Sequence, residues 1–209
     1  MALFDQIVLT SAYLPPVEYF FAVAQSKVTL IEQCELYQKQ SYRNRCVIYS
    51  AGGPESLSIP VVKDGIHSKP IRDIRIDYSE PWLQHHLRAF KAAYNSSPFY
   101  SYYEDDFLSV FNRKPEFLFD LNMELLLLCL NLLGLKAEIR LTEEYEKEYA
   151  NGDFRVSIQP KYKGRSLLEE YEKEKTYFQV FSPKSGFVPN LSVIDILSNE
   201  GPNAISFLL

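Results

Sequence analysis

The fold of this chain is decided by residues 7–32, which read IVLTSAYLPPVEYFFAVAQSKVTLIE. The first three residues form an apolar run typical of a buried strand, and Pro15 and Pro16 can set the backbone for the first turn of a helix over 17–25. Apolar side chains then recur at helical spacing, and residues 27–32 predict a second strand. Together they predict a right-handed βαβ unit whose functional groups follow the strands, at 10–13 and 32–35.

Length and composition indicate one domain over residues 1–209. The chain has 209 residues, 46% hydrophobic and 14% aromatic, which supplies a large core. Its net charge of −5, with scattered basic residues, lacks the basic patch expected of a nucleic-acid binder. The three cysteines show no CxxC spacing, so we expect no structural zinc. We expect no signal peptide and no membrane span, because the longest apolar run, 125–133, falls short of the ~20 residues needed, and hence a soluble, cytoplasmic protein.

The rest of the first part, residues 1–79, adds strands to the βαβ unit. Residues 45–49 and 56–62 predict two paired strands joined by a turn at 51–54. Residues 71–76 alternate isoleucine with polar residues, which predicts a further strand with one buried face. The fold class is therefore α/β, with a mainly parallel or mixed sheet.

Residues 80–135 predict a helical subdomain. Ser79 can cap a first helix, Ser97 and Pro98 can open a second, and residues 116–133 predict a third that ends at Gly134. The third is apolar almost all round, so we expect it at the centre of the protein. In the last part, residues 136–209, a charged segment is followed by predicted strands at 154–158 and 177–181. A final helix begins with a capping box of Ser192 and Asp195 and stops near Gly201.

The sharpest polar cluster is QSYRNR at residues 40–45. Two arginines flanking an asparagine could grip a phosphate or carboxylate, as a nucleotide-sugar or acyl donor would require. The candidate ligand-binding residues are Tyr42, Arg43, Asn44 and Arg45. In the alternative, both arginines are structural and pair with one of three acids, Glu32, Glu35 or Asp73. The sequence leaves both interpretations open.

Tyr13 and His86 are the candidate catalytic residues. His86 shares an apolar helix stripe with Trp82 and could be a general base near neutral pH. A histidine on such a stripe is more often a core residue whose hydrogen bonds are satisfied. Residues 104–106, Glu-Asp-Asp, could bind a cation but also complement the dipole of their helix, so we predict no metal site. No GxGxxG or Gly-Lys-Ser/Thr loop is present, and we expect no cofactor.

Several long motifs resemble the WbqC-like protein family. They are YLPPVEYF at 13–20, QSYRNR at 40–45, the segments 82–86 and 97–99, and PNLSVID at 189–195. The resemblance spans about residues 7–202. Within the family, the sequence is most similar in type to the branch common in Bacteroides-type bacteria. It departs from the family at residues 11–12, where many members read Gln-Pro, and at Glu18, where many have Gly. The family is functionally uncharacterised, and the resemblance implies an association with O-antigen and other surface-polysaccharide gene clusters.

Two functions follow as hypotheses. The first is a cytoplasmic transferase that acts on a sugar or nucleotide-sugar intermediate of surface-polysaccharide synthesis. Its ligand is then an anionic small molecule held by Arg43 and Arg45, with Tyr13 or His86 near the chemistry. The second is a non-catalytic binding or scaffolding protein. In that case the aromatic run 99–103, FYSYY, docks another biosynthetic protein, unless these rings simply pack inside the chain.

Overall fold

The computed structural model describes residues 2–209 and begins with the βαβ unit. β1 (Phe4–Thr10) leads through α1 (Val17–Ala24) to β2 (Ser26–Glu32), and the two strands pair in parallel, with Ile7 opposite Thr29 and Leu9 opposite Ile31. This confirms the predicted unit. β5 (Glu138–Leu141) adds to the free edge of β2, also in parallel, so that the strand order is β1-β2-β5. β5 was missed because it has only four residues, most of them exposed, so its alternation of charged and apolar residues is too short to stand out.

β3 (Arg45–Ser50) and β4 (Gly53–Ser58) form an antiparallel ribbon separate from the parallel sheet. The pairing was predicted, but β4 starts three residues earlier and ends four residues sooner than expected. The strand predicted at 71–76 is wrong. Its first residues form a 3₁₀ turn, η1 (Ile71–Asp73), because the fully buried pair Ile71 and Ile74 is spaced three apart, as in one such turn.

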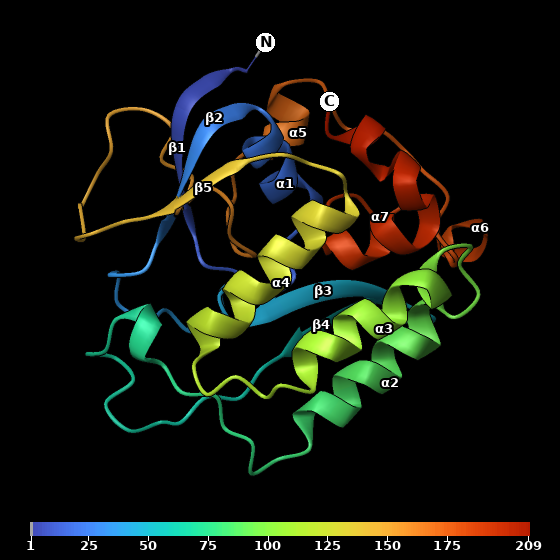
Figure 1. The fold of residues 1–209 in the computed structure, drawn as a ribbon. Coiled ribbons are helices and arrows are strands. Elements are labelled where there is room, and N and C mark those ends of the chain that lie inside the picture. Colours follow the sequence, from blue (N-terminus) through green and yellow to red (C-terminus); the bar gives the residue numbers. More distant parts are fainter. Residues whose placement is uncertain (1) are drawn as a thin grey trace.

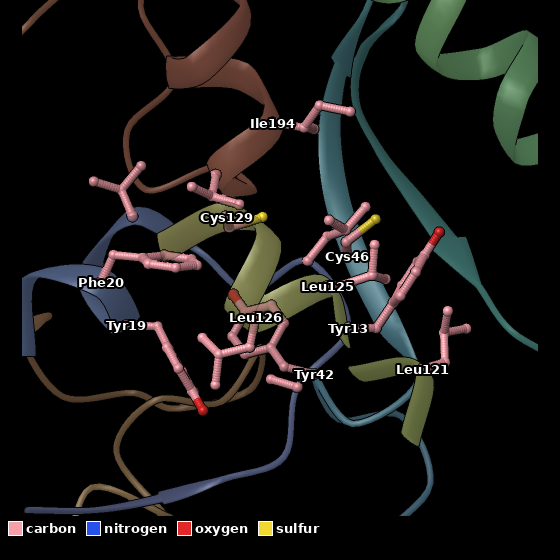
Figure 2. Packing of buried hydrophobic residues seen from close by; sticks show 14 of the residues in the cluster. Tyr13, Tyr19, Phe20, Tyr42, Cys46, Leu121, Leu125, Leu126, Cys129 and Ile194 are labelled. Atoms are coloured by element: carbon pink, nitrogen blue, oxygen red, sulfur yellow. The ribbon is translucent and has the colours of Figure 1, made fainter. Parts of the chain in front are cut away.

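The three predicted helices are present as α2 (Trp82–Tyr94), α3 (Tyr100–Phe111) and α4 (Leu118–Leu132). α4 crosses the middle of the molecule between the parallel sheet and the β3–β4 ribbon (Figure 1). Figure 2 shows its side chains Leu121, Leu125, Leu126 and Cys129 among Tyr13, Tyr19, Phe20, Tyr42 and Cys46. It ends, as predicted, before Gly134, whose φ of 66° suits glycine. No helix within residues 2–209 combines the length and apolarity needed to cross a membrane.

The C-terminal part contains α5 (Leu167–Glu170), α6 (Ser182–Ser185), α7 (Val193–Glu200) and η2 (Gly201–Phe207). The strands predicted at 154–158 and 177–181 are wrong. The first segment is a turn, in which the Ile158 amide donates to the Phe154 carbonyl, and the second is held by the buried side chain of Gln179. α7 starts and stops as expected, but its capping box is absent, because the Ser192 hydroxyl donates to the Leu14 carbonyl instead. Buried residues from all three parts of the chain join one apolar cluster.

Candidate functional site

In the polar segment 37–45, which leads into β3, neighbouring side chains lie in different parts of the structure. Tyr42 enters the core beside α4 (Figure 2). Arg43 lies near the carboxyl end of the parallel sheet, whereas Asn44 and Arg45 line a groove beside β4 and the start of α2. The four candidate ligand-binding residues therefore do not share one pocket.

Arg43 is the largest fully buried side chain and is 1% exposed. Its guanidinium forms a two-pronged contact with Glu35, Nε to Oε1 at 2.8 Å and Nη2 to Oε2 at 2.5 Å. Burial raises the pKa of the Glu35 carboxyl, and the charge of Arg43 opposes that rise. This geometry favours the structural alternative for Arg43, with Glu35 as the acid.

Asn44 and Arg45 line a groove of about 420 Å³. The Arg45 Nε donates to the Ser58 hydroxyl at 3.1 Å, and Arg45 forms no ion pair within residues 2–209. The Asn44 amide donates to the Ile59 carbonyl at 2.8 Å, which fixes its side chain. The charged residues around the groove are Lys39, Arg45, Lys63, Asp77 and Glu80. Cations thus exceed carboxylates here, although the whole chain is negative.

A second hollow of about 340 Å³ adjoins this groove and shares Ser58, Glu80 and Trp82 with it. Trp82 opens α2 and lines both spaces, so the N-terminal end of α2 forms the wall between them. The second hollow is also lined by His85, which is exposed, and by His86, which is buried. We call the two spaces together the α2 groove.

The candidate catalytic residues Tyr13 and His86 touch each other inside the protein. The Tyr13 hydroxyl lies 2.9 Å from His86 Nδ1, and both side chains are buried. Burial raises the pKa of Tyr13 well above its usual value, so the phenol stays protonated, and the tautomer of His86 sets which of the two groups donates. Burial also lowers the pKa of His86 to about 4, opposed by its interaction with the Ser58 backbone. The geometry favours a core pair; the catalytic role of these two residues stays a prediction.

His86→Gln should change how stability depends on pH. In the folded chain His86 stays neutral down to pH about 4, whereas in the unfolded chain it takes up a proton near pH 6.5. The stability that this residue contributes is therefore complete above pH 6.5, and about 3 kcal/mol is lost as the pH falls from 6.5 to 4. Glutamine cannot titrate, so the variant should lack this loss. Urea unfolding at several pH values compares the two chains; parallel stability curves would contradict the buried, neutral His86.

A charge network at the carboxyl ends of β1 and β2 was not predicted from the sequence. Glu32, the last residue of β2 and fully buried, accepts from the Thr142 hydroxyl at 2.8 Å and from Arg155 Nη1 at 3.1 Å. Arg155 also binds Asp153 through Nε at 2.9 Å and Nη2 at 2.6 Å, and the Glu146 carbonyl at 2.9 Å. The one usable signal in the sequence was Glu32, a glutamate that ends an apolar strand. The residues around Arg155 do not identify Arg155 as the partner of Glu32.

Comparison with known proteins identifies the family. Residues 10–172, well over half of the chain, match the WbqC-like protein family. The chain belongs to that family. This WbqC-like chain is also similar to "Uncharacterized protein Rv1507c" of Mycobacterium tuberculosis (strain ATCC 25618 / H37Rv), with 24% identity over an alignment of length 226 that covers 96% of each chain. No solved structure matches it. The matched range contains segment 37–45, the α2 groove and Arg155.

The aromatic run 99–103 offers a smaller exposed surface than the docking hypothesis expected. In the run 99–103, Tyr100 is buried and packs near the Tyr94 ring, and Tyr102 alone projects fully, with 75% exposure. The proposed docking surface is thereby reduced to one largely exposed ring, that of Tyr102. Residues 104–106 lie on α3, and no group of three or more potential metal ligands occurs within residues 2–209.

Proposed function

We propose that this WbqC-like protein binds a nucleotide sugar, or a related sugar phosphate, in the α2 groove and acts on it as a cytoplasmic transferase of surface-polysaccharide (O-antigen) synthesis. The observation that carries the proposal is Arg45, a guanidinium that lines the groove and has no carboxylate partner in the described part of the chain. The gene-cluster association implied by the family resemblance supplies the substrate class.

The charges of the groove favour an anion. Lys39, Arg45 and Lys63 outnumber the two carboxylates of the lining, which gives the groove a net positive charge in a chain of net charge −5. The two Nη groups of Arg45 form no hydrogen bond within the described chain, so they are available to a phosphate in the two-pronged geometry that guanidinium favours.

The size and the walls of the groove suit the rest of such a ligand. The larger of its two spaces, of about 420 Å³, falls within the range of small-molecule sites, and the second space of about 340 Å³ extends it. Tyr37 and Trp82 supply aromatic surface for a base or a sugar ring. Because His86 is held by Tyr13, the neighbouring His85 and Glu80 are the lining groups that could exchange a proton with a bound sugar.

Thermal unfolding with nucleotide sugars tests the proposal. A ligand at 100 times its Kd should add about 2.7 kcal/mol of stability, which raises the Tm of a chain of this length by about 5–10 °C. The panel is UDP-, GDP-, CMP- and dTDP-linked sugars, with the uncharged nucleosides as controls. Stabilisation by none of the nucleotide sugars would contradict the proposal.

Arg45→Met should abolish this stabilisation and leave the ligand-free protein almost unchanged. Arg45 has no carboxylate to leave unpaired, so the free energy of unfolding should stay within about 1 kcal/mol of the original. Arg88→Met is the matched control, since Arg88 is exposed on the same helix as Trp82 and lines no part of the groove. A large loss of stability in Arg45→Met, or binding that survives the change, would remove Arg45 from the site.

A further inference from the structure

A separate hollow of about 480 Å³ lies beside the charge network at the carboxyl ends of the parallel strands. Arg43 and Glu35 form one side, and Asp153 and Arg155, from the loop after β5, form another. Open α/β sheets bind ligands at this end of their strands. We call this space the sheet-end hollow. It lies outside the α2 groove, and none of its lining residues belongs to that groove.

The charges of the sheet-end hollow cancel. Its basic residues are Arg43, Lys147 and Arg155, and its acidic residues are Glu35, Glu148 and Asp153. Moreover, the two buried arginines are already paired, Arg43 with Glu35 and Arg155 with both Glu32 and Asp153. A charged ligand that enters the buried part of the hollow would have to displace one of these pairs or remain unpaired there, because the other two lining charges, Lys147 and Glu148, are exposed. The hollow therefore suits an uncharged molecule, unlike the α2 groove.

Arg43, which lines this hollow, has one donor without a partner. Nη1 of Arg43 is buried and makes no hydrogen bond within residues 2–209, although Nε and Nη2 of the same group are used. A buried guanidinium N–H without an acceptor is unfavourable. Because Glu35 already balances the charge, the fitting partner is a neutral oxygen, a hydroxyl or a carbonyl. Nη1 is closed to solvent in this structure, so binding of such an oxygen requires lining side chains to move.

The other lining groups also fit a sugar ring. Gln38 and Tyr149 can both donate and accept hydrogen bonds, and Tyr145 and Val156 add apolar surface at the rim. A sugar ring combines hydroxyls that donate and accept with apolar C–H faces.

We propose that the sheet-end hollow binds an uncharged sugar, with a hydroxyl or carbonyl oxygen on Arg43 Nη1. This goes beyond the proposed function, because it needs no ligand in the α2 groove. A further hollow of about 320 Å³ joins the two sites. It shares Gln38 and Val156 with the sheet-end hollow, and Lys39 and Gln40 with the α2 groove. An anionic sugar donor and an uncharged acceptor could thus lie along one continuous surface.

Ligand-detected NMR on the full chain tests the proposal. The probes are the methyl glycosides of glucose, rhamnose and N-acetylglucosamine, with methyl glucuronide as the charged counterpart of the glucoside. At least one neutral glycoside should bind, and the glucuronide should bind at least about tenfold more weakly than the glucoside if the glucoside is the one bound. Binding of none of the three neutral probes at about 20 mM overturns the proposal, as does a glucuronide that binds as well as the best neutral probe.

Two variants locate the bound sugar. Val156 is 75% exposed at the rim, so Val156→Trp should fill the entrance without disturbing the core and weaken binding at least about tenfold. Leu127→Trp is the control, because Leu127 is 54% exposed on α4 and lines none of these hollows; it should bind as the original chain does. Unchanged affinity in Val156→Trp would place the sugar elsewhere and overturn the assignment. Arg43 itself is unsuitable for this test, because its removal breaks a buried ion pair.

Discussion

Arg43→Met should lower the free energy of unfolding by about 3–5 kcal/mol, because the change leaves the buried Glu35 carboxylate without its cation. Both Nε and Nη2 of Arg43 donate to that carboxylate, so two hydrogen bonds are lost together. In a chain of this length the Tm should fall by about 6–20 °C. Urea unfolding at pH 7 measures the change, with Arg45→Met as the control only two residues away.

The double variant Arg43→Met/Glu35→Met separates the cost of a stranded charge from the cost of lost packing. When both charged partners are replaced by apolar groups of similar size, much of the stability should return. Stability of Arg43→Met within about 1 kcal/mol of the original would show that Glu35 reaches water or takes up a proton easily. In that case Arg43 would return to the ligand-binding candidates.

Arg155→Met should destabilise the chain by a similar amount, about 3–5 kcal/mol, and should loosen the loop after β5 in particular. Arg155 links this loop to the sheet through its side chain, because it contacts the buried Glu32, Asp153 and the Glu146 carbonyl at once. It also lies over the Tyr149 ring, with 4.9 Å between the guanidinium carbon and the ring centroid. Without Arg155, the buried Glu32 carboxylate keeps only one side-chain hydrogen-bond donor, the Thr142 hydroxyl.

Amide hydrogen exchange localises this effect. Exchange should accelerate most at residues 143–156, while α4, which has no contact with Arg155 among its hydrogen bonds, should change less. Arg165→Met is the control, since Arg165 is exposed and its guanidinium makes a single hydrogen bond, to the Glu169 carbonyl at 3.4 Å. Uniform acceleration across the chain, or none in the loop, would show that Arg155 does not hold the loop to the sheet.

The sequence alone determined the elements whose signal is local. Pro15 and Pro16 between an apolar run and a helical stripe sufficed for the βαβ unit, and the apolar stretch 118–132 sufficed for the central helix. Local patterns gave wrong strand predictions where a short alternation of apolar and polar residues had another cause. Ile71 and Ile74 are buried by one 3₁₀ turn. Segment 154–158 turns away from β1 after a single bridge between Asp153 and Val8, and segment 177–181 belongs to no strand. Alternation shows which side chains are buried, but a strand also needs a partner, and that partner is remote in sequence.

The tertiary structure decided which polar residues are available to a ligand. The sequence marked Arg43 and Arg45 as equals, with pairing to an acid as the alternative for both. Within residues 2–209, the fold brings Glu35 to Arg43 and no carboxylate to Arg45. It also joins Tyr13 to His86 across 73 residues and Glu32 to Arg155 across 123 residues. Whether a charge is free depends on the groups within a few ångströms of it, and the chain path brings those groups from distant positions that no local pattern encodes.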